Sequence, residues 1–198
     1  MFAGIVQAQG IVSARRERGG DVELVVAAEG LDLGHARIGD SIAVSGVCLT
    51  VTQIAGASFA SDVSRETLGC TTLGGFTSGS SVNLEMALTA GDPIGGHLVS
   101  GHVDGIGRLL TRRAEARSER FEFEVPAELA RYVARKGSVC IDGVSLTVNE
   151  VQGARFTVNL IPHTLAVTTL GGLAAGGQVN IEVDLVARYL ERLAEFAP

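Results

Sequence analysis

The chain has 198 residues, 46% of them hydrophobic and 19% charged, and a formal net charge of −6. These values are typical of a packed globular protein; they exclude a disordered chain, and the acidic charge gives no electrostatic footprint for nucleic acid. No run approaches the roughly 20 apolar residues of a membrane-spanning helix. The three cysteines have no C-x-x-C spacing, so we expect free thiols, a cytoplasmic location and no membrane contact.

The first half is predicted to form short strands punctuated by glycine. The β-prone runs 42–44 and 49–52 flank Ser45-Gly46, which predicts a hairpin. Beyond these strands the chain enters a glycine-rich linker over 90–98, which carries Pro93. We expect a domain boundary inside this linker, between residues 97 and 98.

The second half repeats the pattern. Asp142-Gly143 lies between the β-prone runs 139–141 and 146–149, and an Asp-Gly pair in this setting strongly indicates a hairpin. Alternating apolar and polar residues predict further strands at 121–125, 156–160 and 179–183. Strands spaced about 8–12 residues apart favour an all-β barrel or sandwich in each half.

Two helices are predicted in the second half. Residues 127–136 follow Pro126, end in a basic turn and precede Gly137, which is the usual punctuation of a helix. Residues 185–193 place five apolar residues on one stripe, after a candidate N-cap at Asp184. The first half has no counterpart of this second helix, so we expect the segment 185–198 to mediate self-association.

One pattern connects the halves, because the chain repeats itself after 97 positions. Gly-Val-Cys-Leu-Thr-Val at 46–51 returns as Gly-Val-Ser-Leu-Thr-Val at 143–148, and Thr-Thr-Leu-Gly-Gly at 71–75 returns at 168–172. This period is too long for a solenoid repeat and matches a small domain. We therefore expect two copies of one domain, at 1–97 and 98–184.

The differences between the copies are chemical. Four positions exchange distinct residue types beside segments that match; the pairs are Cys48/Ser145, Glu66/His163, Ala87/Asp184 and Ile5/His102. Each alone has a structural interpretation, with Cys48 as a small buried residue and Asp184 as a helix cap. The repeated Thr50 and Thr147 fit ordinary strand positions as well. Together, these residues favour two related pockets with different catalytic groups.

The histidines and cysteines predict no metal site. His97 and His102 are five positions apart and share no strand or helix face, and the cysteine spacings fit no zinc pattern. There is also no P-loop and no G-x-G-x-x-G motif. We therefore expect neither a metal nor a nucleotide-binding α/β domain.

Several motifs, in the right order and spread over essentially the whole chain, closely resemble the riboflavin synthase family of the alpha-chain type. They are Met-Phe-Ala-Gly-Ile-Val at 1–6, Gly-Val-Cys-Leu-Thr-Val at 46–51, Gly-Gly-His-Leu-Val-Ser-Gly-His-Val at 95–103, Lys-Gly-Ser at 136–138, Asp-Gly-Val-Ser-Leu-Thr-Val at 142–148 and Ile-Pro-His-Thr-Leu at 161–165. The departure at the start is Ala3, where the family usually has threonine.

The resemblance implies an all-β fold, a tandem repeat of two six-stranded antiparallel Greek-key barrels plus a C-terminal α-helix that joins a homotrimer. It implies a dismutation in which two molecules of 6,7-dimethyl-8-ribityllumazine exchange a four-carbon unit, giving riboflavin and 5-amino-6-ribitylaminouracil without a metal or redox cofactor. Lumazine synthase is a candidate partner. The competing hypotheses are a non-catalytic lumazine- or flavin-binding carrier and a flavin-dependent reductase.

Carried over by motif, the family's substrate pockets form between the N-barrel of one subunit and the C-barrel of its neighbour. The N-barrel pocket is expected to contain Gly4, Ile5, Val6, Cys48, Leu49, Thr50, Asp62, Val63, Ser64, Arg65, Glu66 and Thr67. The C-barrel pocket is expected to contain Gly101, His102, Val103, Lys136, Ser145, Leu146, Thr147, Leu160, Ile161, Pro162, His163, Thr164 and Leu165.

We further expect catalytic roles for seven residues. Phe2, Ser41 and Cys48 would shape the site of one substrate. His102, Ser145, Thr147 and Asp184 would act on the other. His102 or an activated hydroxyl is the candidate base, and Cys48, water or a ribityl hydroxyl is the candidate nucleophile.

Overall fold

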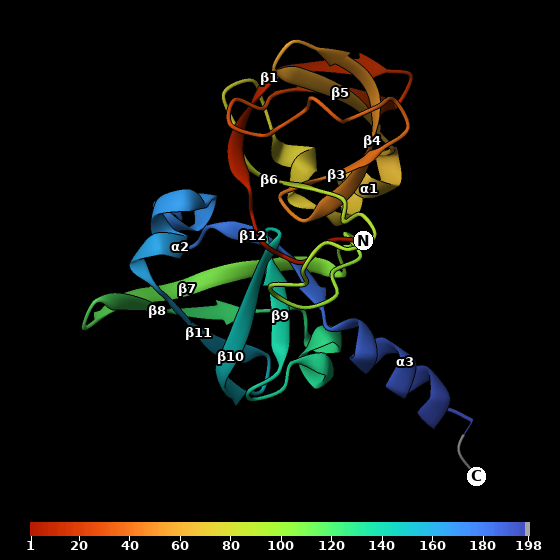
Figure 1. The fold of residues 1–198 in the computed structure, drawn as a ribbon. Helices are drawn as coiled ribbons and strands as arrows, with labels where there is room; N and C mark the ends of the chain where they lie inside the picture. The colour runs from red at the N-terminus through yellow and green to blue at the C-terminus, as the bar shows by residue number, and fades with distance from the viewer. Residues whose placement is uncertain (197–198) are drawn as a thin grey trace.

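The structure, a computed structural model that describes residues 1–196, contains two closed antiparallel barrels of six strands, one above the other in Figure 1. The predicted fold class is therefore confirmed. In the first barrel, neighbouring strands follow the order β1-β2-β5-β4-β3-β6. Their bounds are β1 Ala8–Arg18, β2 Asp21–Ala27, β3 Ser41–Val44, β4 Val47–Ala55, β5 Ser58–Val63 and β6 Ser81–Met86.

The second barrel closes in the same order, β7-β8-β11-β10-β9-β12. Its strands are β7 Gly105–Glu115, β8 Ser118–Glu124, β9 Ser138–Ile141, β10 Val144–Gln152, β11 Arg155–Leu160 and β12 Gln178–Val183. The two predicted hairpins are confirmed as β3–β4 and β9–β10. The strands predicted in the second half are β8, β11 and β12.

Short helices occupy matching places in the two repeats. In the first, α1 (Arg65–Cys70) is followed by the 3₁₀ helix η1 (Thr72–Gly75). In the second, α2 (Pro162–Val167) is followed by η3 (Thr169–Gly172). Helices α1 and α2 were not predicted from the sequence, because helices of a single turn or two have little stability of their own and depend on tertiary packing.

The helix predicted at 127–136 is wrong in type and length. The structure has a 3₁₀ helix, η2, over Ala127–Tyr132, and Val133 is already extended, with φ −87° and ψ 112°. Leu129 and Val133 are both buried in the core of the second barrel. A short 3₁₀ segment is a usual form of connection between strands, and the proline start, basic turn and glycine stop do not distinguish it from an α-helix.

Each barrel encloses its own hydrophobic core. The core of the first contains Leu24, Ile42 and Phe59, and that of the second contains Phe121, Phe123 and Phe156. A third, smaller cluster contains Phe2, Ala43, Val99 and Cys140, so it draws residues from both repeats. The barrels are therefore independent cores joined by a packed contact.

That contact is built around the tips of two equivalent hairpins. Ser45 and Gly46 have φ 45° and 79°, and Asp142 and Gly143 have φ 47° and 81°. A Cβ on Gly46 would lie 2.7 Å from the nitrogen of Gly143, and a Cβ on Gly143 would lie 2.9 Å from the nitrogen of Gly46. The tips therefore touch backbone to backbone, which only glycine permits.

Two equivalent asparagines tie the barrels together. The Nδ2 of Asn83 donates to the carbonyl of Asp142, and its Oδ1 accepts from the N–H of Thr169, each at 2.8 Å. Asn180 makes the reciprocal pair, donating to the carbonyl of Ser45 and accepting from the N–H of Thr72, again at 2.8 Å. These bonds explain why Val-Asn is repeated: each asparagine binds the hairpin tip and helix of the other barrel.

The C-terminal helix projects away from the barrels (Figure 1). α3 covers Leu185–Ala194, and the Asp184 carboxylate accepts from the N–H of Val186 as its N-cap. The predicted cap is therefore confirmed; residues 197–198 of the expected segment lie outside the described residues. Exposed apolar side chains line the helix and its end: Val186, Tyr189, Leu190, Leu193 and Phe196. Within residues 1–196, none of the helices has the length and apolar character needed to span a membrane.

Candidate functional site

The segments that precede the two barrels are exchanged between them. The N–H of Ser145 in β10 donates to the carbonyl of Gly4, at 2.8 Å, so the N-terminal segment lies on the second barrel. The N–H of Cys48 in β4 donates to the carbonyl of Gly101, also at 2.8 Å, so the linker segment lies on the first. Both segments run through the contact region between the barrels (Figure 1).

The approach at both crossings is very close. A Cβ on Gly4 would lie 2.6 Å from the Cβ of Ser145, and one on Gly101 would lie 2.6 Å from the Cβ of Cys48. Both glycines also have positive φ, 71° and 79°. The glycines thus allow each segment to reach the strand of the opposite barrel.

This exchange corrects the expected grouping of the pocket residues. From the sequence we expected Gly4, Ile5 and Val6 beside Cys48, and Gly101, His102 and Val103 beside Ser145. The structure places the two segments the other way round. Chain order suggested the first grouping, but a segment that precedes a barrel can pack on either barrel, and only tertiary contacts decide.

The first barrel carries a small pocket at the crossing. Its volume is about 260 Å³, and its lining combines β4, α1 and the exchanged segment. The lining residues are Val47, Cys48, Glu66, Thr67, Cys70, Thr71, Gly101, His102 and Val103. Six of the predicted site residues, Cys48, Glu66, Thr67, Gly101, His102 and Val103, therefore meet in one pocket, which we call the Cys48 pocket.

Helix α1 gives this pocket its polar edge. Ser64 is the N-cap, and its Oγ accepts from the N–H of Thr67 at 3.2 Å. The thiol of Cys70 donates to Glu66, and this hydrogen bond raises the pKa of Cys70. The pocket can thus offer a thiol, a hydroxyl, a carboxylate and the exposed imidazole of His102 to a bound molecule.

The equivalent site on the second barrel, the Ser145 site, combines Ser145 of β10 with the exchanged segment at Gly4. The Ser145 hydroxyl lies 2.7 Å from Nδ1 of His97. Burial lowers the pKa of His97, and the carboxylates of Asp184 and Glu182 oppose this effect. A neutral imidazole is therefore favoured, and it can orient or activate the Ser145 hydroxyl.

His97 was missed as a site residue, although the motif at 95–103 contains it. The comparison of the repeats could not find it, because the equivalent position would precede Met1. Its Nε2 is buried and has no hydrogen-bond partner among the described residues. Among the described residues, Ser145 is bonded to an imidazole and the Cys48 thiol is not, so the two sites differ by more than a thiol and a hydroxyl.

The other predicted residues fall into three groups by exposure. The side chains of Leu49, Val63 and Leu160 are buried in the barrel cores, so only their backbone can face a ligand. The second group remains exposed on the outside of the barrels: Thr50, Asp62, Arg65, Lys136, Thr147, Ile161, Pro162 and His163. Leu146, Thr164 and Leu165 are half-buried. Direct substrate contact by these residues stays a prediction.

Phe2 does not fit the direct role that was expected. Its side chain is 0% exposed, packed in the cluster between the barrels, where it lies close to Gly101. Its backbone pairs with Val99, N–H to carbonyl at 2.7 Å. Phe2 therefore supports the exchanged segments and cannot touch a bound molecule in this structure.

Lys136 occupies a strained turn. Its φ is 68°, while the equivalent residue of the first barrel is Gly39, with φ 97°. Both residues donate their N–H to the following long strand, Lys136 to Val148 and Gly39 to Val51. A lysine in this backbone conformation destabilises the fold by about 1 kcal/mol or more. This cost is consistent with a functional use of the Lys136 side chain.

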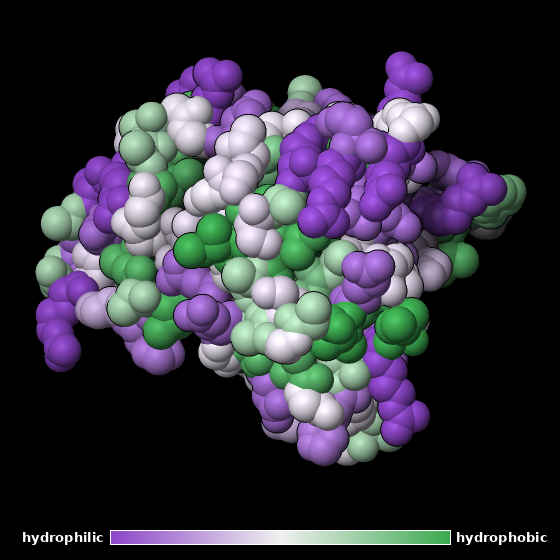
Figure 2. All heavy atoms as spheres, turned by 90° about the horizontal axis from the view of Figure 1, so that it is seen from above, coloured by the Kyte–Doolittle hydropathy of each residue, from purple (hydrophilic) through white to green (hydrophobic). Residues whose placement is uncertain are grey.

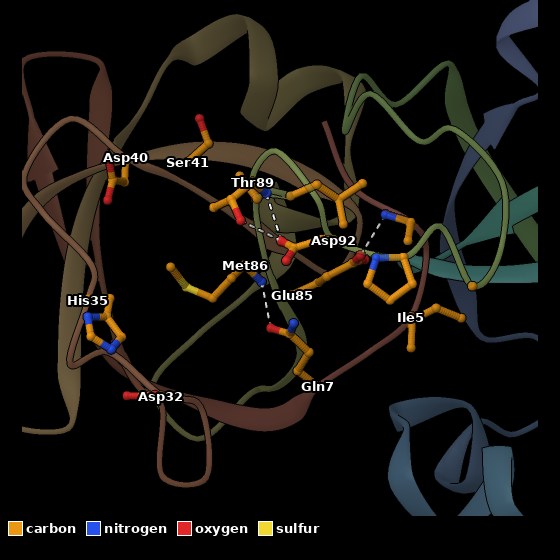
Figure 3. Close-up of a pocket in the computed structure, with 15 residues that line it drawn as sticks. Ile5, Gln7, Asp32, His35, Asp40, Ser41, Glu85, Met86, Thr89 and Asp92 are labelled. Carbon is orange, nitrogen blue, oxygen red and sulfur yellow. Dashed lines mark hydrogen bonds between the residues drawn. The ribbon is translucent and has the colours of Figure 1, made fainter.

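Ser41 lies beside a second, larger cavity of about 630 Å³ on the first barrel (Figure 3). Ser41 pairs with Thr50 across β3 and β4. The cavity also contains acidic groups and a histidine, among them Asp32, His35 and Asp40. In the second barrel the corresponding end carries Tyr132, which donates to Glu191 of α3. The cavity therefore lies where the first repeat lacks an equivalent of α3.

Comparison with known proteins finds the same repeat and identifies the family. The Lumazine binding domain family matches the chain twice, over residues 3–87 and 100–184. Riboflavin synthase from Photobacterium phosphoreum is 45% identical over 193 residues, covering 98% of this chain and 88% of the relative. Riboflavin synthase from Mycobacterium bovis is 45% identical over 203 residues, covering 100% of both chains.

A solved structure supports the fold. The crystal structure of LumP complexed with riboflavin has a TM-score of 0.85 and is 25% identical; the similarity covers 92% of this chain and 99% of that one. A LumP complex with 6,7-dimethyl-8-(1'-D-ribityl) lumazine has a TM-score of 0.83 at 24% identity, with the same coverage.

Proposed function

This chain belongs to the riboflavin synthase family of enzymes, and from that membership we propose that it converts two molecules of 6,7-dimethyl-8-ribityllumazine into riboflavin and 5-amino-6-ribitylaminouracil. A four-carbon unit passes from one molecule, the donor, to the other, the acceptor. Atoms and electrons balance without an added oxidant or reductant.

The observation that carries the proposal is the pair of related but unequal sites. Two copies of the same substrate must be held in similar sites and yet react differently. The Cys48 pocket offers a thiol and the His102 imidazole, whereas the Ser145 site offers a hydroxyl bound to His97. A repeat that keeps its framework and exchanges its polar groups is what such a reaction needs.

The chemistry assigns tasks to these groups. A proton must leave the acidic ring methyl of one lumazine, and His102 or the Ser145 hydroxyl, activated by His97, would accept it. A nucleophile must add to the ring of the other, and the Cys48 thiol or water would serve. Holding the two ring systems face to face would supply much of the acceleration.

We propose that the complete site forms between subunits of a homotrimer. Thr50, His102, Thr147 and His163 are exposed in a single chain, which leaves both sites open to a neighbour. The exposed apolar residues of α3 would supply the contact that joins the subunits. In this proposal, residues 1–97 and 98–184 form the two lumazine-binding barrels, and residues 185–198 form the segment that joins the subunits.

A metal-free, anaerobic incubation of the purified protein with 6,7-dimethyl-8-ribityllumazine tests the reaction. The expected result is one riboflavin formed for every two lumazines consumed. The similarity to LumP favours a second candidate, a carrier that binds these ligands. Binding without conversion would support the carrier and contradict the enzymatic proposal.

A further inference from the structure

Two buried carboxylates, Glu85 in β6 and Glu182 in β12, lie where the exchanged segments enter the contact between the barrels. They occupy equivalent positions of the repeat, and each residue is 3% exposed. Glu85 pairs with Ala43 across β6 and β3, and Glu182 pairs with Cys140 across β12 and β9. Neither carboxylate has an ion-pair partner among the described residues.

Both carboxylates bind backbone N–H groups of an exchanged segment. Glu85 accepts from Ala3 at 2.7 Å and from Gly4 at 3.1 Å, and Figure 3 shows its side chain directed at that segment. Glu182 accepts from the N–H of Ser100 at 2.7 Å and from the N–H of Gly101 at 2.9 Å. Such charge-assisted bonds are roughly twice as strong as neutral ones.

These bonds fix the residues that precede the two sites. Gly101 is held by Glu182, and the next residue, His102, lines the Cys48 pocket. Gly4 is held by Glu85, and its carbonyl accepts from the N–H of Ser145. Each carboxylate therefore stands in one barrel and holds the segment that completes the site of the other.

We propose that Glu85 and Glu182 are positioning residues that act across the barrels: Glu182, in the second barrel, orders the Cys48 pocket of the first, and Glu85, in the first, orders the Ser145 site of the second. This inference rests on the proposed function of the two sites.

The two contacts differ by one hydroxyl. The Oγ of Ser100 also donates to Glu182, at 2.6 Å, whereas the equivalent residue of the first repeat is Ala3, which has no donor to add. Burial raises the pKa of Glu85, opposed by the N–H groups of Ala3, Ile5 and Gly4. The Glu85 contact therefore lacks the side-chain hydrogen bond that Ser100 adds to the Glu182 contact.

Protection of the Cys48 thiol by riboflavin measures one site alone. Cys140 is buried, with its thiol pKa raised well above the usual value, so alkylation in a Cys70→Ser background reports Cys48. Glu182→Gln should raise the riboflavin concentration that gives half-protection by about tenfold, which corresponds to the loss of one or two charge-assisted bonds. Ser100→Ala, which keeps the backbone bonds, should raise it about threefold.

Glu85→Gln is the matched control. It removes an equally buried carboxylate from the barrel that contains Cys48, and it should change half-protection less than about twofold. Its turnover of 6,7-dimethyl-8-ribityllumazine should fall nevertheless, because the Ser145 site is disordered. Ala3→Ser should supply the missing donor to Glu85 and lower KM without changing Cys48 protection.

The crossed pattern decides between positioning and general stability. Equal loss of protection in Glu182→Gln and Glu85→Gln, or no loss in Glu182→Gln and Ser100→Ala, would overturn the proposal. Normal turnover by the unmodified chain together with either result would leave the proposed function intact. Absence of turnover and of riboflavin protection in the unmodified chain would contradict the proposed function, and with it the positioning role.

Discussion

The two barrels share one framework and differ in what they present at equivalent places. Strand order, hairpin tips, crossed asparagines and buried glutamates recur. The sites differ: Cys48 against Ser145, with His97 on one side only. The ends differ too, since the first barrel has an open cavity beside Ser41 where the second carries α3. Function is therefore expected in the differences, and stability in what is repeated.

The exposed apolar residues of α3 show the same division of roles. On the face seen in Figure 2, hydrophobic side chains form separate groups among polar ones. The apolar residues of α3, such as Tyr189 and Leu193, are more than half exposed. An unrepeated apolar helix on a duplicated framework is consistent with an assembly role that the duplication itself does not supply.

The largest expected effect comes from breaking the shared contact at the hairpin tips. Gly46→Ala should lower the free energy of unfolding by about 3 kcal/mol or more, because its Cβ would lie 2.7 Å from the nitrogen of Gly143. Gly56→Ala is the control: Gly56 has φ 60° and open space around it, so it should cost only about 1–2 kcal/mol. Urea unfolding of both variants measures the difference; equal costs would contradict the close contact.

The next effect is a pH dependence confined to one of the two tips. Burial raises the pKa of Asp142 to about 7, opposed by the N–H of Asn180, whereas the equivalent residue is the uncharged Ser45. The folded state therefore binds a proton that the unfolded state releases near 3.8. Its contribution to stability is complete below about pH 3.8 and is lost as the pH rises through about 7.

Asp142→Ser should remove this loss, because Ser45 shows that serine fits the turn and can accept from the strand N–H. Unfolding experiments across this pH range measure the slope, with a change on the order of 2–4 kcal/mol expected in the unmodified chain. Glu85 will leave a smaller dependence of the same sign. Parallel pH curves for the two proteins would exclude Asp142 as the source.

The crossed asparagines should give equal, smaller effects. Asn83→Ala and Asn180→Ala each remove two hydrogen bonds to backbone groups of the other barrel. Each should lower the free energy of unfolding by about 2 kcal/mol. Thermal or urea unfolding measures both losses. A loss in only one variant would mean that the two asparagines do not contribute equally to stability, although their contacts are equivalent.

The smallest effect in energy separates the two sites. His102→Gln should lower kcat by about tenfold and flatten its pH profile, if His102 moves a proton. His97→Gln should act on the Ser145 site and leave the alkylation rate of Cys48 unchanged, because His97 contacts Ser145 and does not line the Cys48 pocket. Unchanged kcat and pH profile in His102→Gln would remove it from the candidate bases.

The two domains and their hairpins could be predicted from the sequence because the chain repeats the segments that form them. The repeat predicted two domains, and the turn pairs Ser45-Gly46 and Asp142-Gly143 located the hairpins that later form the contact. Asp184 was predicted as a cap for a different reason: the local chemistry of a helix start determines it, and the first repeat has Ala87 there. These features depend on neighbours in the chain.

The parts that escaped prediction depend on distant contacts. Glu85 and Glu182 are identical in the repeats, so a search for differences passed over them, although they bind segments 81 or 82 positions away. The exchange of the Gly4 and Gly101 segments has no signal in chain order. Phe2 was assigned a direct role, and only its burial corrects this.

A crystal structure of the protein with bound riboflavin would show which segment completes the site of the first barrel. We expect the bound molecule to contact both Cys48 and His102 of one chain, with the Gly101 carbonyl still bound to the Cys48 N–H. A riboflavin that contacts Cys48 together with Ile5 and Val6 of the same chain, and not with His102, would contradict the exchange of segments between the barrels.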